Sequence, residues 1–135
     1  MRIKEIMNVK PYVLRADNTL LKTLEFMRLE NVSNLPVVDE KNKLIGLVTY
    51  REIVNGLAQG DIQKLLIRDI MAQNVVALEP DTPLKGAIEI MLINKCSCLP
   101  VVDKGRKLIG MVTEPYLLRT LYDVTSMPEE FYNVG

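Results

Sequence analysis

Five consecutive residues, Leu35-Pro36-Val37-Val38-Asp39, return unchanged 64 positions later as Leu99-Pro100-Val101-Val102-Asp103. The flanking residues repeat in the same register, because residues 3–54 align on residues 67–118 without a gap and more than a third of the pairs are identical. A period of 64 is too long for a solenoid repeat and indicates a duplicated small domain. We therefore predict two domains, residues 1–60 and 61–123, followed by a C-terminal tail, residues 124–135.

The two copies share one order of predicted elements. An apolar, β-leaning stretch comes first, and a helix follows whose apolar residues recur at the spacing that keeps one face on a core. These stretches are residues 12–14 and 75–78, and the helices end near Glu30 and Asn94. In the second copy Thr82 is the expected N-cap and Pro83 the first helical residue, and in the first copy Asn18 or Thr19 takes the cap.

Two short strands and a last helix complete each copy. Residues 35–38 and 44–49 are joined by a polar turn, which predicts an antiparallel hairpin. After the hairpin, Thr49-Tyr50-Arg51-Glu52 fits a capping box, and Thr113-Glu114-Pro115 starts the same helix in the second copy. Each copy is thus expected to be β-α-β-β-α, and the fold class is α+β.

Composition narrows the classes of function. The 135 residues carry 17 Lys+Arg against 17 Asp+Glu, so we expect neither nucleic acid nor a membrane surface as a partner. There is no His, which removes the most common general base and metal ligand. No apolar run reaches the ~18 residues of a membrane span, and the first residues lack the apolar stretch of a signal peptide. These features predict a cytoplasmic protein that is not an enzyme.

The repeated motifs resemble the CBS domain, the cystathionine-β-synthase-type module. The matching residues are Asp81-Thr82-Pro83-Leu84, the Leu-Pro-Val-Val-Asp segments, and Leu-Ile-Gly-x-Val-Thr at residues 44–49 and 108–113. This resemblance implies a tandem pair, or Bateman module, packed sheet to sheet about a pseudo-twofold axis with two clefts between the copies. It also implies that the clefts bind adenosine-containing ligands (AMP, ADP, ATP, S-adenosylmethionine or dinucleotides), that two modules form a homodimer, and that the module has no catalytic cofactor.

One cleft is expected to bind better than the other. Family sites combine the strand entry of one copy with the Thr-x-x-Asp at the start of the last helix of the other copy, where a helix N-terminus favours a phosphate. The first copy has Glu52 at the Asp position, and the second copy has Tyr116 there, which cannot accept two ribose hydroxyls. The better cleft is predicted to use Thr49, Arg51, Glu52, Asn34, Cys96 and Ser97, and the poorer cleft Thr113, Tyr116, Val32 and Ser33.

Two of these features have plainer interpretations. Thr49 and Glu52 fit a capping box that stabilises the helix by about 1 kcal/mol whether or not a ligand is bound. Cys96 and Cys98 could be half of a metal site or a redox pair, but no His and no third Cys completes a tetrahedron, which favours small, half-buried thiols.

These observations lead to two hypotheses of function. The first is a free-standing regulatory module that binds an adenosyl ligand and signals to an unknown partner protein. The second is a dimerisation or scaffold module whose clefts do not bind a ligand. Arg51 is the predicted phosphate contact, and neither Asn34 nor Cys98 adds a positive charge, so weak binding or a ligand with few phosphates is expected.

Overall fold

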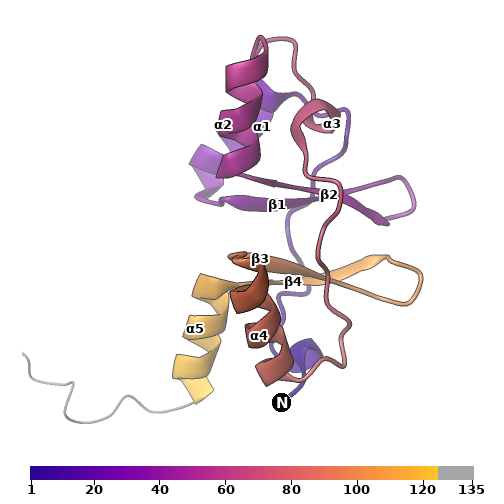
Figure 1. Ribbon diagram of the computed structural model, residues 1–135, viewed down its shortest axis with the longest axis vertical. Coiled ribbons are helices and arrows are strands. Elements are labelled where there is room, and N and C mark those ends of the chain that lie inside the picture. The colour runs from indigo at the N-terminus through magenta and orange to yellow at the C-terminus, as the bar shows by residue number, and fades with distance from the viewer. Residues whose placement is uncertain (125–135) are drawn as a thin grey trace, which may run out of the picture.

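The computed structural model describes residues 1–124 and divides them into two similar halves (Figure 1). The upper half of the figure contains α1 (Leu20–Glu30), β1 (Asn34–Val38), β2 (Leu44–Thr49) and α2 (Tyr50–Gln59). The lower half contains α4 (Leu84–Asn94), β3 (Cys98–Val102), β4 (Leu108–Thr113) and α5 (Glu114–Val124). Two short helical turns, η1 (Ile3–Glu5) and α3 (Ile67–Ile70), precede the repeats. The predicted α+β class is confirmed, and the predicted tail beyond Val124 lies outside the described residues.

The hairpins form as predicted, whereas the first strand of each copy does not. β1 pairs with β2, and β3 pairs with β4, both antiparallel. Leu14 and Leu78 each make only a single parallel bridge, to Val37 and Val101. After Leu14 the chain turns, because the N–H of Arg15 donates to the side chain of Asn18 (2.8 Å) rather than to a neighbouring strand. Each predicted first strand is therefore reduced to one paired residue.

The helix boundaries follow local chemistry. Thr19 caps α1 by accepting a hydrogen bond from the N–H of Lys22 (3.2 Å). In the second copy Pro83 is the N-cap and Leu84 the first helical residue, one position later than predicted, because the backbone of Pro83 is extended (ψ 146°). Both helices end as predicted, since the next residues, Asn31 and Lys95, have left-handed backbones with φ of 54° and 52°.

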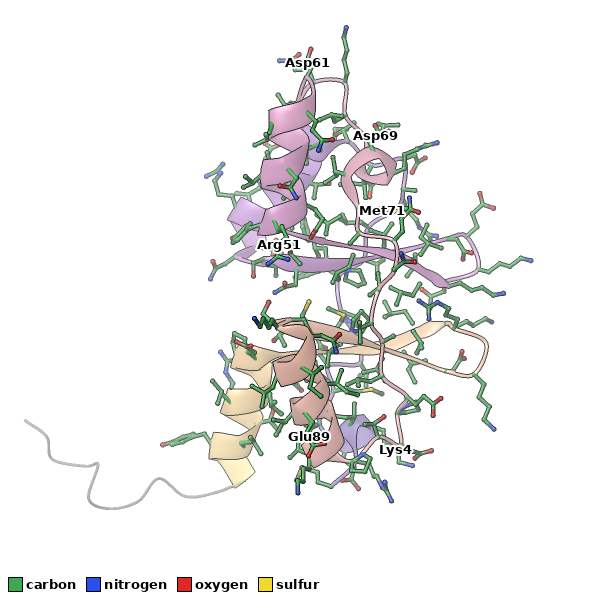
Figure 2. The ribbon with its side chains drawn as sticks, in the orientation of Figure 1. Lys4, Arg51, Asp61, Asp69, Met71 and Glu89 are labelled. Atoms are coloured by element: carbon green, nitrogen blue, oxygen red, sulfur yellow. The ribbon has the colours of Figure 1, made fainter. Side chains whose placement is uncertain are left out.

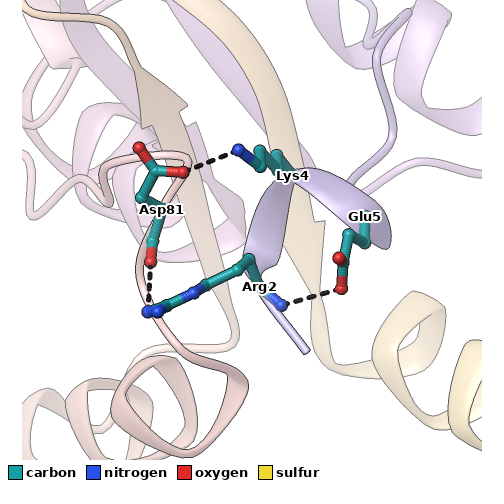
Figure 3. A network of polar contacts seen from close by, with 4 residues as sticks. All are labelled: Arg2, Lys4, Glu5 and Asp81. Atoms are coloured by element: carbon teal, nitrogen blue, oxygen red, sulfur yellow. Dashed lines mark hydrogen bonds and ion pairs between the residues drawn. The ribbon is translucent and has the colours of Figure 1, made fainter.

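The N-terminal segment packs on the second repeat rather than on the repeat that follows it in sequence. Ile3 and Ile6 are buried in the core of the second repeat, whereas Ile67, from α3, is buried in the core of the first. Backbone hydrogen bonds fix this exchange, from Ile3 N–H to the carbonyl of Thr82 and from Lys4 N–H to the carbonyl of Pro80 (2.9 Å each). The exposed side chain of Lys4 also forms an ion pair of 2.8 Å with Asp81, in the loop before α4 (Figure 3). Each repeat thus packs against the helical turn that precedes the other repeat in the sequence.

The segments that follow these turns extend the two hairpins. Asn8 exchanges two backbone hydrogen bonds with Met111 in β4 (2.9 and 3.0 Å), and Ala72 does the same with Leu47 in β2 (2.9 and 3.0 Å). One residue earlier, Met7 and Met71 lie against Gly110 and Gly46. The chain therefore crosses between the halves along the edges of both hairpins.

The two hairpins face each other across the middle of the molecule (Figure 1). Val38, Leu44, Val102 and Leu108 form a small core between them. The hairpin turns are joined by two reciprocal hydrogen bonds, from Leu44 N–H to the carbonyl of Arg106 (3.1 Å) and from Leu108 N–H to the carbonyl of Asn42 (2.9 Å). Because equivalent residues of the two repeats meet, the predicted sheet-to-sheet packing about a pseudo-twofold axis is confirmed. Within residues 1–124, no helix has the length and apolarity to cross a bilayer.

Candidate functional site: two unequal clefts between the repeats

The larger cleft between the repeats is a cavity of about 350 Å³. Its size is within the range of ~300–1,000 Å³ that small-molecule sites occupy. The first repeat contributes the start of α2, and the second contributes the segment between α4 and β3; Figure 2 shows Arg51 at the end of α2 that faces the second repeat. All six residues predicted for the better cleft line this cavity: Asn34, Thr49, Arg51, Glu52, Cys96 and Ser97.

The start of α2 is fixed by a capping box. The N–H of Thr49 donates to Oε1 of Glu52 (2.8 Å), and the hydroxyl of Thr49 donates to the same oxygen (2.6 Å). Arg51 N–H donates to the Thr49 hydroxyl oxygen (3.3 Å). The capping box predicted for Thr49 and Glu52 is therefore present. Only Oε1 takes part in them, so Oε2 can accept from a ligand while the helix stays capped.

The larger cleft carries two cations. Arg51 and Lys95 both line the cavity, and both side chains are exposed. Lys95 was missed from the sequence. It could have been found, because it is the residue immediately before Cys96 and its left-handed backbone ends α4. A guanidinium and an ammonium beside a helix N-terminus favour a negatively charged group on a ligand.

The two thiols of the larger cleft remain protonated at neutral pH. Burial raises the pKa of Cys98 to about 12, with smaller contributions from Cys96, Glu52 and Glu114. Burial also raises the pKa of Cys96. The thiolate is the form that binds metals and attacks disulfides, so these environments disfavour both kinds of chemistry. Within residues 1–124 no group of three His, Cys, Asp or Glu residues could hold a metal ion.

The smaller cleft is a cavity of about 190 Å³ and carries no charged side chain among its lining residues. Val32, Thr113 and Tyr116 line it as predicted. Ser33 does not, because it faces the larger cavity, whereas Asn34 lines both. Thr113 accepts a hydrogen bond from the N–H of Tyr116 (3.2 Å), so this hydroxyl caps α5 as Thr49 caps α2.

The crossing segments also line the clefts, which the repeat alignment did not reveal. Asn8, Pro11 and Tyr12 line the smaller cavity, and Ala72 lines the larger one. Tyr12 is held in place by an edge-to-face contact with Phe26 (centroids 5.0 Å apart) and a hydrogen bond to Glu30 (3.3 Å). Tyr12 belongs to the stretch predicted as the first strand, but nothing in the sequence pattern predicts that these segments line the clefts.

Two facing hairpins, helices on their outer sides and a cleft at the start of each last helix define a pair of CBS domains. The CBS domain family model matches residues 3–59 and again residues 67–123. The chain belongs to the CBS domain family.

Two protein sequences show the range of its relatives. An uncharacterized 17.7 kDa protein of Acidianus ambivalens is 31% identical over 126 residues, which cover 93% of this chain and 76% of that protein. Inosine-5'-monophosphate dehydrogenase of Methanocaldococcus jannaschii is 34% identical over 111 residues. The aligned part covers 82% of this chain but spans only 21% of the dehydrogenase.

Solved structures have the same fold. The CBS domain pair of protein MJ0100, in complex with 5'-methylthioadenosine and S-adenosyl-L-methionine, has a TM-score of 0.80 at 29% identity and covers 93% of this chain and 98% of that one. CBSX2 of Arabidopsis thaliana, in complex with AMP, has a TM-score of 0.80 at 24% identity and covers 91% of this chain and 97% of that one. At that identity the second likeness concerns the fold alone.

Proposed function

We propose that the larger cleft binds an adenosine-containing ligand and that its occupancy regulates a partner protein. The observation that carries the proposal is that the six residues predicted from two distant stretches of sequence line one cavity of about 350 Å³. The complex of the MJ0100 pair with two adenosyl compounds, at 29% identity, supports the ligand class. The reaction of the dehydrogenase does not transfer, because the aligned part is a fifth of that enzyme.

The polar groups of the cleft suggest how such a ligand is held. Oε2 of Glu52 accepts from the ribose hydroxyls, and the Thr49 end of α2 with Arg51 faces the phosphate or other polar end of the ligand. Lys95 adds a second cation on the opposite wall. With two exposed cations, the cleft suits a ligand with few phosphates.

A thermal melt against AMP, ADP, ATP, adenosine, 5'-methylthioadenosine, S-adenosylmethionine and NAD tests this proposal. A ligand at 100 times its Kd adds about 2.7 kcal/mol, which shifts the Tm by roughly 10 °C for a chain of this size. Glu52→Gln should lose most of that shift without lowering the unliganded Tm, since Gln also completes a capping box. Tyr116→Phe, in the smaller cleft, is the matched control and should keep the shift.

Regulation requires a surface that a partner protein or a second copy of the chain can bind. The same positions of both repeats expose apolar side chains on the helices: Leu29 and Ile93 are 68% and 79% exposed, and Val54 and Leu118 are 63% and 68% exposed. In Figure 1 these four helices lie on one side of the molecule. Exposed apolar patches mark interaction sites. We propose that two copies of the chain associate through these exposed helix faces. We also propose that the protein acts in the cytoplasm.

A scaffold without a ligand is the second candidate. The smaller cleft has an uncharged lining and a small volume, which favour a cleft that binds no ligand. If no compound of the panel shifts the Tm while the protein remains a dimer, the scaffold function replaces the ligand-binding one.

A further inference from the structure

A third cavity opens on the first repeat and shares no lining residue with either cleft. It measures about 600 Å³ and is lined by three segments: residues 15–17 before α1, the hairpin from the end of β1 into β2, and the start of α3. The walls are tied together by the hydrogen bond from Arg68 N–H to the Ala16 carbonyl (2.9 Å) and by the Arg15 guanidinium, which donates to the Asp39 carbonyl. These contacts make the cavity a feature of the fold rather than of one loop.

Four cationic side chains line this cavity: Arg15, Lys41, Lys43 and Arg68. Three carboxylates, of Asp17, Asp39 and Glu40, lie among them. The Asp39 carboxylate is used by the hairpin turn, since one oxygen accepts from the N–H groups of Lys41 and Lys43 (2.9 Å each). Across residues 1–124, the side-chain nitrogens of Lys41, Lys43 and Arg68 form no ion pair and no hydrogen bond with the protein.

The second repeat provides an internal comparison. Lys4 and Asp81 occupy the positions equivalent to Arg68 and Asp17, and they form an ion pair of 2.8 Å (Figure 3). No such pair joins Arg68 to Asp17 in the described chain. The position of Arg15 is taken by Glu79 in the second repeat. Among the described residues, the same backbone thus carries an ion pair in one repeat and two arginines that form no ion pair with a carboxylate in the other.

We propose that this cavity of the first repeat binds a small oligophosphate of the pyrophosphate type. A guanidinium is planar and matches phosphate oxygens in pairs, and Arg15 and Arg68 present two such groups from two walls. Lys41 and Lys43 supply point charges from the third wall. The volume of about 600 Å³ is within the range that small-molecule sites occupy.

Calorimetric titration of pyrophosphate into the full chain at low salt tests the proposal. We expect one saturable site per chain that weakens as salt is added, because the contacts are exposed charges. Arg68→Ala should weaken binding at least tenfold, which corresponds to the loss of a charge-assisted hydrogen bond. Lys43→Ala is a second variant on another wall and should also weaken it. Within residues 1–124 the side-chain nitrogens of both residues form no ion pair and no hydrogen bond, so both variants should melt like the wild type.

Lys4→Ala and Lys107→Ala, at the positions of the second repeat equivalent to Arg68 and Lys43, are the controls and should leave pyrophosphate binding unchanged. A parallel titration with uridine diphosphate distinguishes the source of the group: tighter binding than pyrophosphate indicates a nucleotide, and equal or weaker binding indicates the free ion. Absence of saturable binding at millimolar pyrophosphate overturns the proposal. So does binding that Arg51→Ala abolishes and Arg68→Ala leaves intact.

Discussion

Two glycines mark the places where the chain crosses between the repeats. A Cβ at Gly46 would lie 2.5 Å from Sδ of Met71 and 3.1 Å from the carbonyl oxygen of Ala72, and a Cβ at Gly110 would meet Met7 in the same way. Neither glycine has a positive φ, so the constraint is space rather than backbone conformation. The repeated Leu-Ile-Gly motif is thus explained by a methionine packed on it.

We predict that Gly46→Ala destabilises the protein by about 1–3 kcal/mol, the usual effect of overpacking. Gly105→Ala is the control, because its Cβ would have only one neighbour within 4 Å, Oδ1 of Asp103 at 3.5 Å. It should change stability by less than about 0.5 kcal/mol. Urea unfolding measures both. Equal effects of the two substitutions would show that Met71 yields freely and that the packing is loose.

The buried thiol of Cys98 makes stability depend on alkaline pH. A thiol in the unfolded chain loses its proton near pH 9.0, whereas in the folded protein burial raises the pKa of Cys98 to about 12. Between these values the unfolded state binds fewer protons, so stability falls as pH rises. Below pH 9 both states are protonated and the contribution is constant.

We therefore predict that the unfolding free energy of the wild type falls more steeply than that of Cys98→Ala above pH 9. The difference in slope should approach 1.4 kcal/mol per pH unit. Comparing the slopes removes the constant cost of the substitution and the titration of Lys and Tyr that both proteins share. Parallel curves would mean that Cys98 is not protected from ionisation.

At the scale of elements, local signals predicted most of the helices and strands. Neighbouring residues determine the caps of α1 and α2, at Thr19 and Thr49, and the ends of α1 and α4. These boundaries could therefore be predicted from the sequence. The exchange of η1 and α3 was not predicted, because turns of three and four residues carry no periodicity. Their position depends on packing against residues far away in sequence.

The exchange predicts that a substitution at the N-terminus weakens the second repeat. Ile3 is fully buried in its core, so Ile3→Ala should cost about 2–5 kcal/mol. Val9→Ala, at a side chain 62% exposed, is the control and should cost little. Chemical denaturation gives both values, and hydrogen exchange should show faster exchange in β3 and β4 for Ile3→Ala. If Ile3→Ala behaves like Val9→Ala, the segment is not part of that core.

At the scale of the molecule, the exposed helix faces predict a dimer that charge can break. Val54→Asp and Leu118→Asp each place a carboxylate in the apolar surface and should shift the protein toward the monomer. Val76→Asp, at an apolar side chain 40% exposed outside the helices, should not. Light scattering coupled to gel filtration measures the mass. A wild-type monomer, or a dimer indifferent to Val54 and Leu118, contradicts this surface as the interface.

The lining of the larger cleft was predicted more completely than that of the smaller cleft. Its six predicted residues follow from the resemblance to the CBS domain, which combines the start of the last helix of one copy with the strand entry of the other. The crossing residues Asn8 and Ala72 could not be predicted in this way, because they line the clefts only once the segments between the repeats have exchanged. Ser33 lies in the other cleft from the one predicted, since its neighbour Asn34 sits at the border of both cavities.

The proposed regulation depends on an adenosine-containing ligand that binds between the repeats at the start of α2. The most direct measurement is a titration of the isotope-labelled protein with AMP, followed by the backbone amide signals. We expect the amide signals of Thr49, Arg51 and Glu52 to shift together with those of Cys96 and Ser97, with one binding curve. Shifts that leave these two segments unchanged, or no saturable shift at millimolar AMP, would contradict it.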